Sequence, residues 1–211
     1  MKDKNQAYLL SLQHYDKAID HLRDDAERNQ VPIVDQLSLD LIQQLIRIHQ
    51  PREILEIGCA IGYSAMQFAS VHSEIQVTTI ERNNEMIQQA KMNFSQYGYE
   101  NQIRLIEADA TEAFDRVNDR IYDMIFIDAA KAQSQRFFEL YSPLVRKKGV
   151  IITDNILYHG FVADIDIVQS RNVKQMVKKV RKYNDWLSQQ TDFTTNFIHM
   201  DDGLAISIKE R

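Results

Sequence analysis

The chain has few of the residues that mark secreted, fibrous or membrane proteins. It contains one cysteine, Cys59, so no internal disulfide can form, as in proteins of a reducing compartment. Only 3 of its 211 residues are proline and 6 are glycine, which excludes collagen-like and low-complexity chains. No apolar run approaches the roughly 20 residues that a membrane-spanning helix needs, and residues 1–5 lack the apolar core of a secretory signal. We therefore expect a cytoplasmic protein without a membrane partner.

The composition that is present is typical of one compact globular unit. Hydrophobic residues make up 44% of the chain and charged residues 26%, and the length is enough to bury a full core. We expect a single domain over residues 1–211. The formal net charge of -5 argues against general coating of nucleic acid, although a local basic patch can still bind it.

The first 50 residues carry a helical pattern. Residues 3–28 are polar with sparse apolar positions at helical spacing, and Val31-Pro32 interrupts them. A second helical stretch ends at Pro51. On one face of this stretch the sequence places Leu37, Leu41, Leu45 and Ile48. We expect residues 1–50 to form a lid or a homodimer contact ahead of an α/β core at 51–211.

After Pro51, short β-branched runs alternate with amphipathic stretches, which is typical of a parallel sheet with crossover helices. We predict strands near 53–57, 75–80, 102–107, 121–127 and 150–153. We predict helices near 63–71, 83–97, 111–117, 133–146 and 170–188, with Gly98 and Gly149 ending the second and the fourth. Residues 193–199 and 204–208 form a hairpin around residues 201–203, so one of these strands runs antiparallel. The fold class is a Rossmann-like α/β fold with a seven-stranded, mainly parallel sheet and helices on both faces.

The segment after the first predicted strand indicates a cofactor loop, because ligands bind beyond the carboxyl ends of the strands in such sheets. Gly58 and Gly62 allow a sharp turn and a close approach of the backbone to a ligand. The dinucleotide fingerprint has a third glycine where this chain has Ala60, and Glu56 stands just before the loop. A carboxylate there suits a cofactor with an ammonium and a sulfonium better than a pyrophosphate.

Two further strand ends carry acidic residues in suitable places. Glu81 follows the second strand, 23 positions after Gly58, where such folds hold the hydroxyls of a ribose. Asp109-Ala110 follows the third strand and is placed to contact an adenine.

The fourth and fifth strand ends predict a cation site. Asp128 follows one strand, and Asp154 and Asn155 follow its expected neighbour. These three side chains offer hard oxygen ligands with no histidine or cysteine nearby, which favours Mg²⁺ or Ca²⁺ over zinc. Magnesium would keep open positions for a substrate.

Together these residues resemble the catechol-type, metal-dependent, class I O-methyltransferases that use S-adenosylmethionine (SAM). The resemblance runs from about Val31 to the C-terminus, and its most specific parts are residues 128–131, residues 154–160 and Asp202-Gly203. The chain departs from the family at two positions. Ala130 replaces an aromatic residue, and Tyr158 stands where many relatives have tryptophan.

The resemblance implies roles for individual residues. The cofactor contacts that it implies are Val34, Glu56, Gly58, Ser64, Glu81, Asp109, Ala110 and Asp128. It places Mg²⁺ on Asp128, Asp154 and Asn155, and it puts Lys131 at the position of the catalytic base, with Asp128 and Asn155 completing the catalytic set.

Such a metal holds an acceptor that carries two neighbouring oxygens, and both a catechol and a 5-hydroxyuridine base meet that description. Residues 171–182 include six basic residues and no acidic one, which favours RNA as a partner. The basic residues in question are Arg171, Lys174, Lys178, Lys179, Arg181 and Lys182. The chain is most similar to the bacterial tRNA 5-hydroxyuridine methyltransferases that act at the wobble position, so tRNA is the expected substrate.

Plainer interpretations stay open. The glycines could form an ordinary turn, the strand-end carboxylates could cap helices, and Lys131 and the basic helix could simply be solvated. We expect His159 and His199 to be structural or pocket-lining, and Cys59 to be a packed side chain. The alternative functions are methylation of small catechols or phenols, a nucleotide- or NAD-binding protein, and an RNA-binding module without methyl transfer.

Overall fold

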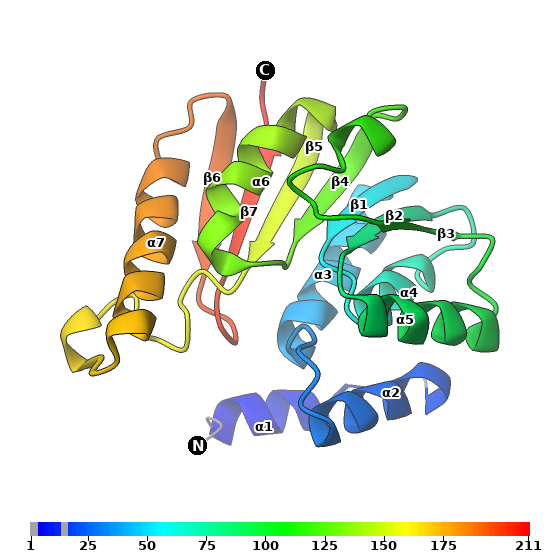
Figure 1. The fold of residues 1–211 in the computed structure, drawn as a ribbon, viewed down its shortest axis with the longest axis horizontal. Helices are drawn as coiled ribbons and strands as arrows, with labels where there is room; N and C mark the ends of the chain where they lie inside the picture. Colours follow the sequence, from blue (N-terminus) through cyan, green and yellow to red (C-terminus); the bar gives the residue numbers. More distant parts are fainter. Residues whose placement is uncertain (1–3, 14–16) are drawn as a thin grey trace.

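The computed structural model describes residues 4–13 and 17–211 and shows one sheet covered by helices on both faces (Figure 1). The strand order is β3-β2-β1-β4-β5-β7-β6. The strands are β1 Glu53–Ile57, β2 Gln76–Glu81, β3 Ile103–Glu107, β4 Tyr122–Ile127, β5 Val145–Asp154, β6 Phe193–Ile198 and β7 Leu204–Lys209. The α-helices are α1 Lys4–Ser11, α2 Lys17–Arg28, α3 Gln36–His49, α4 Tyr63–Ala69, α5 Asn84–Tyr97, α6 Ser134–Tyr141 and α7 Arg171–Leu187. Because β7 alone runs against its neighbours, the expected sheet with one antiparallel strand is confirmed.

The central strands bury both of their faces, because successive side chains of a strand point to opposite sides. In β1, Ile54 belongs to the apolar cluster shared with α2 to α5, whereas Leu55 belongs to the cluster shared with α6 and α7. Phe126 and Ile125 of β4 divide in the same way. Runs of consecutive apolar residues therefore form the middle of the sheet. Among the described residues no helix is both long and apolar enough to cross a membrane.

Two predicted helices differ from the structure. Residues 111–117 form only turns and the short 3-10 helix Phe114–Arg116. The helix expected to run to residue 146 ends at Tyr141, and a 3-10 turn that contains Pro143 follows it. The chain then enters β5 at Val145, which pairs with Tyr122 across a shift in register, so Gly149 lies inside a strand instead of ending a helix. Gly98 does end α5, with a φ of 76°.

The apolar face predicted for α3 is right only in part. Leu41 and Leu45 are partly buried and pack against the core, whereas Ile48 is 72% exposed. The most deeply buried apolar positions of the helix, at 39, 42 and 46, were not in the prediction.

The N-terminus of α3 is capped from a distant part of the chain. Asp35 occupies the cap position without a side-chain cap bond. Asp201, in the turn between β6 and β7, instead accepts hydrogen bonds from the N–H and the hydroxyl of Ser38, at 2.8 and 2.9 Å. Asp201 also accepts a hydrogen bond from Gln6 of α1. The C-terminal hairpin thereby fixes the start of α3.

Candidate functional site

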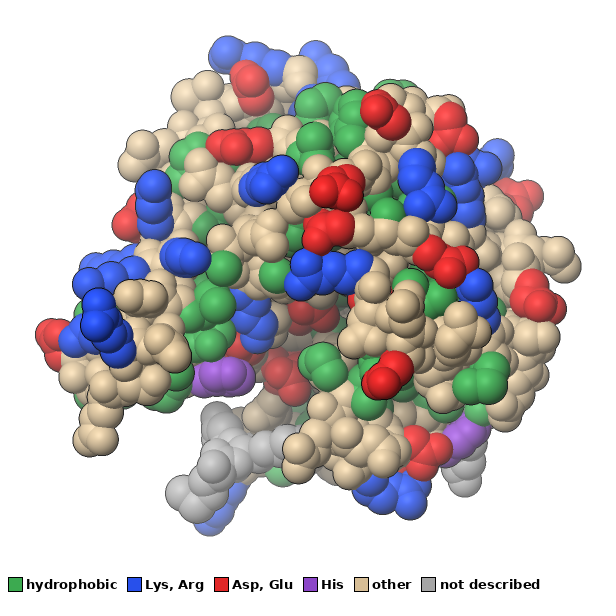
Figure 2. All heavy atoms as spheres, in the orientation of Figure 1, with side chains coloured by type: hydrophobic (Ala, Val, Ile, Leu, Met, Phe, Trp, Pro, Cys, Tyr) green, Lys and Arg blue, Asp and Glu red, His purple; other side chains and the backbone are tan. Residues whose placement is uncertain are grey.

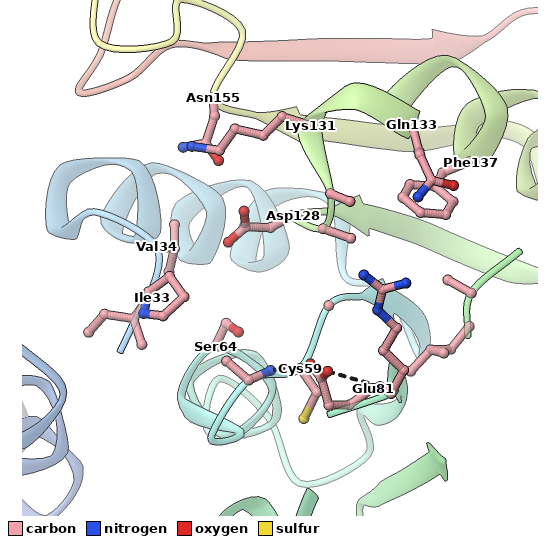
Figure 3. A pocket seen from close by; sticks show the side chains of 18 of the residues that line it. Ile33, Val34, Cys59, Ser64, Glu81, Asp128, Lys131, Gln133, Phe137 and Asn155 are labelled. Atoms are coloured by element: carbon pink, nitrogen blue, oxygen red, sulfur yellow. Dashed lines mark hydrogen bonds between the residues drawn. The ribbon is translucent and has the colours of Figure 1, made fainter. Parts of the chain in front are cut away.

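A cavity of about 560 Å³ opens at the carboxyl ends of the parallel strands (Figure 3). Its wall includes residues 32–35, the loop after β1 and the residues that follow β2, β3 and β4. Nine of the residues singled out in the sequence line it: Val34, Gly58, Ser64, Glu81, Asp109, Ala110, Asp128, Lys131 and Asn155. Glu56 and Asp154 do not line it.

The loop after β1 passes very close to the end of β4. Gly58 has a φ of 102°, and a Cβ atom there would lie 2.1 Å from the carbonyl oxygen of Asp128. Its N–H donates to the carbonyl of Ile80 at 3.1 Å, and the N–H of Asp128 donates to the carbonyl of Ile57 at 3.0 Å. The absence of a side chain at Gly58 therefore allows the ends of three strands to meet beneath the cavity.

Glu56 lies fully buried behind this loop. Its carboxyl accepts hydrogen bonds from the hydroxyl of Ser64 at 2.6 Å and from that of Thr79 at 2.5 Å. Burial raises the pKa of Glu56 to about 7, against the opposing effect of these two bonds. Because Ser64 lines the cavity, Glu56 is connected to the cavity through that hydroxyl.

Two carboxylates at the next strand ends are held by backbone N–H groups. Glu81 accepts hydrogen bonds from the N–H groups of Ala60 and Asn83, both at 2.9 Å. Asp109 accepts from the N–H and the hydroxyl of Thr111, both at 2.8 Å. These bonds lower the pKa of Asp109 to about 2. Both side chains are therefore fixed acceptors, suited to hydroxyl or amino donors on a ligand.

Beyond them lies an acidic group around Lys131. Asp128 and Asn155 line the cavity, and Lys131 and Asn155 point toward one another above the Asp128 carboxylate (Figure 3). Burial raises the pKa of Asp128 to about 6, although Lys131 acts in the opposite direction. Burial and the nearby charge of Asp128 raise the pKa of Asp154 well above its usual range. The N–H of Asn155 donates to Asp154 at 2.6 Å.

These residues combine the buried carboxyl group of Asp154, the half-buried carboxyl group of Asp128 and one amide. Within the described ranges, no group of three or more Asp, Glu, His or Cys side chains is arranged to hold a metal ion. The oxygen atoms of Asp128, Asp154 and Asn155 are nevertheless of the kind that magnesium prefers. Two adjacent carboxylates that both lose their hydration are stabilised by a nearby cation, so this donor set fits a divalent ion chemically.

One site residue had appeared in the sequence only as part of a motif. Asp202, 8% exposed, lines the same cavity, and its Oδ2 lies 3.7 Å from Nζ of Lys131 and has no hydrogen-bond partner. Its other oxygen accepts a hydrogen bond from the N–H of His159. Nζ of Lys131 also lies 5.4 Å from the ring centroid of Tyr158. The turn signal at 201–203 located the hairpin but could not show which side chains it would reach.

The histidine and cysteine predictions have different outcomes. His159 lines the cavity from its exposed rim, whereas His199 is exposed and does not line it. Cys59 is 1% exposed, and burial raises the pKa of its thiol. It is a packed side chain, as predicted.

The basic helix α7 has the expected two-sided character. Val177 and Val180 are buried, and the opposite side faces solvent. Figure 2 shows Lys and Arg side chains gathered over α7, where Lys178, Lys179, Arg181 and Lys182 are exposed. Lys174 lies 3.6 Å from Asp166 in an ion pair.

The sequence profile of a family described as O-methyltransferase matches residues 12–210. The chain belongs to this O-methyltransferase family. A crystal structure from Staphylococcus aureus, provisionally described as a caffeoyl-CoA O-methyltransferase, is 63% identical and has a TM-score of 0.96, with 98% of this chain and 100% of that one covered. The O-methyltransferase TomG from Streptomyces achromogenes, solved in complex with SAM, is 25% identical with a TM-score of 0.83, covering 97% and 95% of the two chains.

Curated relatives of this O-methyltransferase carry related names. "Probable caffeoyl-CoA O-methyltransferase 2" of Dictyostelium discoideum is 29% identical over 170 residues, which cover 78% of this chain and 72% of that protein. The family match and the cofactor-bound structure show that the chain is a SAM-dependent O-methyltransferase. The NAD-binding and non-catalytic alternatives are thereby set aside.

Proposed function

We propose that this O-methyltransferase binds Mg²⁺ beside SAM and methylates an acceptor with two neighbouring oxygens, namely 5-hydroxyuridine at the tRNA wobble position. The observation that carries the proposal is the meeting of Asp128, Asn155 and Lys131 at one end of the cavity, with Asp154 buried directly behind Asn155. The exposed basic side of α7 favours RNA over a small acceptor.

In this proposal the cofactor occupies the part of the cavity nearer β1 and β2. Glu81 accepts hydrogen bonds from the ribose hydroxyls, and Asp109 with Ala110 meets the adenine. Ser64 holds the amino-acid end, with the Glu56 carboxyl behind it. Val34 closes the cavity from the opposite wall (Figure 3). SAM supplies a methyl group bound to a positively charged sulfur. An aligned acceptor oxygen bonds to the methyl carbon as the carbon–sulfur bond breaks, which leaves S-adenosylhomocysteine.

At the acceptor end, Asp128, Asp154 and Asn155 would hold the metal. Bound there, Mg²⁺ would supply a positive charge that lowers the pKa of an acceptor hydroxyl. Lys131 lines the cavity and, as the neutral amine, would take that proton; the ammonium so formed would lie beside the Asp202 carboxylate, 3.7 Å from Nζ.

The metal is tested by a binding readout as well as by activity. Mn²⁺ serves as an electron paramagnetic resonance probe, and Asp154→Asn should abolish its tight binding, whereas Asp192→Asn, at an exposed position, should not. Methyl transfer should stop on chelation and return with Mg²⁺. Activity that survives thorough chelation, or equal Mn²⁺ binding by both variants, would refute the metal.

The RNA partner is tested on α7. Replacing Lys178, Lys179, Arg181 and Lys182 with alanine should weaken binding of a tRNA anticodon stem-loop. The slope of log affinity against log salt should fall by about 3 if each side chain meets a phosphate of a single strand. The matched control replaces four exposed basic residues near the amino ends of β1 and β5, away from α7: Arg47, Arg52, Lys147 and Lys148. An equal loss in both variants would mean that α7 contributes only general charge.

A second candidate is methylation of a small catechol, which is supported by the names of the relatives: they refer to caffeoyl-CoA, the thioester of a catechol acid. Mass spectrometry of tRNA nucleosides from cells that lack the protein decides between the two. We expect 5-hydroxyuridine to accumulate and its methylated form to disappear. Unchanged tRNA nucleosides, together with turnover of catechols by the purified enzyme, would favour the small acceptor.

We further propose a homodimer in which α1 takes part. This helix has no buried residue, and Tyr8 and Leu9 on it are exposed, as is Leu12 in the turn that follows, which is unusual for a segment left in solvent. Light scattering should give a mass near twice 24.7 kDa. Replacing the three residues with serine should then yield monomers, and a monomeric natural chain would refute the proposal.

A further inference from the structure

Arg23 of α2 is directed at the wall of the cofactor cavity although it does not line the cavity itself. Its side chain is 14% exposed, which is low for an arginine on a short amphipathic helix. The apolar face of the same helix is buried, through Ile19, Leu22 and Ala26. The guanidinium group is therefore carried into the interior by the packing of α2.

Besides an ion pair with Glu27 at 4.0 Å, three contacts join this guanidinium group to the cavity wall. It donates a hydrogen bond to the carbonyl oxygen of Val34 at 2.8 Å and another to the hydroxyl of Tyr63 at 3.3 Å. Its carbon also lies 5.0 Å from the centroid of the Tyr63 ring. Val34 and Tyr63 both line the cavity and are almost completely buried, so one side chain joins two of its walls.

The wall that contains Val34 has little structure of its own. Residues 31–35 form no helix or strand between α2 and α3. The segment is anchored at its start by the bond from Val31 N–H to the carbonyl of Ala26, and at its end by the bond from Leu39 N–H to the carbonyl of Asp35. Arg23 supplies a hydrogen bond between these two anchors. The position of residues 32–34 therefore depends on it.

We infer that Arg23 is a positioning residue for the cofactor: it holds residues 31–35 against α4, and thereby slows the release of SAM and of the S-adenosylhomocysteine product. The inference rests on the proposed placement of SAM in this cavity, and it does not depend on the acceptor or on a metal. Losing a hydrogen bond from a charged donor should loosen the segment and speed the dissociation of S-adenosylhomocysteine roughly tenfold. The affinity for S-adenosylhomocysteine should fall by a similar factor, because the substitution removes contacts that stabilise the bound state.

The test measures the binding of S-adenosylhomocysteine to the full chain. Calorimetry gives the affinity, and stopped-flow displacement gives the dissociation rate. Arg23→Gln removes the charge, and Arg23→Lys keeps it but cannot span the Val34 carbonyl and the Tyr63 ring together. Arg28→Gln is the matched control, because Arg28 lies on the same helix but is exposed and pairs with Asp25. We expect both Arg23 variants to release the ligand faster and the control to match the natural chain.

Hydrogen–deuterium exchange separates positioning from a loss of fold. In Arg23→Gln, the amides of Val31 and of residues 33–35 should exchange faster with ligand bound, while those of β1 and β4 should not change. If Arg23→Gln fails to fold, Arg23→Lys decides alone. The proposal is overturned if S-adenosylhomocysteine dissociates from Arg23→Lys at a rate within twofold of that of the natural chain.

Discussion

A side chain at Gly58 should disrupt both the fold and the cofactor site, because two separate penalties combine there. The backbone at Gly58 has a φ of 102°, outside the small left-handed region open to other residues. An added Cβ would also lie 2.1 Å from the Asp128 carbonyl oxygen, where close carbon–oxygen contacts are normally about 3.3 Å. The end of β4 would have to retreat by about 1 Å, which strains the bond from Asp128 to Ile57.

Gly98 provides the reference for this prediction. Its φ of 76° is also positive, but a Cβ there would meet no atom within 4 Å. Gly98→Ala should therefore show backbone strain alone, about 1 kcal/mol, and lower the melting temperature by about 2–4 °C. Gly58→Ala adds overpacking of about 1–3 kcal/mol and more backbone strain, so its melting temperature should fall by roughly 6–12 °C.

Circular dichroism melts and calorimetric titration with S-adenosylhomocysteine measure both effects. Gly98→Ala should bind the ligand normally, whereas Gly58→Ala should bind it at least tenfold more weakly because Asp128 moves. If the two variants melt together and bind equally, the close approach of β1 and β4 is not what requires a glycine.

Further predictions concern individual polar groups. Ser64→Ala removes the donor to a buried Glu56 oxygen and should lower the free energy of unfolding in urea by about 1–3 kcal/mol; an unchanged midpoint would contradict that bond. The pKa of Glu56 is raised from 4.5 to about 7, so the group destabilises the fold increasingly as the pH rises from about 4.5 to 7. Glu56→Gln should flatten the pH dependence of unfolding in that window, and the same slope in both proteins would show that another group titrates. The pKa of Asp109 is lowered from 3.8 to about 2, so its stabilisation is complete above pH 4 and is lost as the pH falls through 2. Asp109→Asn should lose this acid-dependent part of stability, and an identical acid transition would refute it.

The sequence was sufficient for features that are encoded locally. The alternation of strands and helices, the end of α5 at Gly98 and the residues that follow each parallel strand could all be located, because strand ends meet at one edge of such a sheet. This is why nine separately chosen residues line one cavity. Their individual roles toward the cofactor, the metal and the acceptor stay predictions.

Contacts between residues far apart in the chain could not be predicted. The approach of Asp202 to Lys131 and of Arg23 to Tyr63 depends on how the C-terminal hairpin and α2 pack on the sheet. The early start of β5 was missed because residues 146–148 are charged. Val145 pairs with Tyr122, but the register shifts before the pairing resumes at Val150. The partly wrong face of α3 has a similar cause: the helix has apolar residues on more than one side, and tertiary packing buries those at 39, 42 and 46 more deeply than Leu41 and Leu45.

Two successive residues of one tight turn serve opposite sides of the enzyme. Asp201 ties down the beginning of α3, next to the wall that contains Val34, and Asp202 faces Lys131 and the loop at His159. An inserted or deleted residue in this turn would exchange or misdirect both attachments at once. In the function proposed above, the binding sites for the methyl donor and for the acceptor thus share a single mechanical support, and neither can be remodelled through this hairpin without disturbing the other.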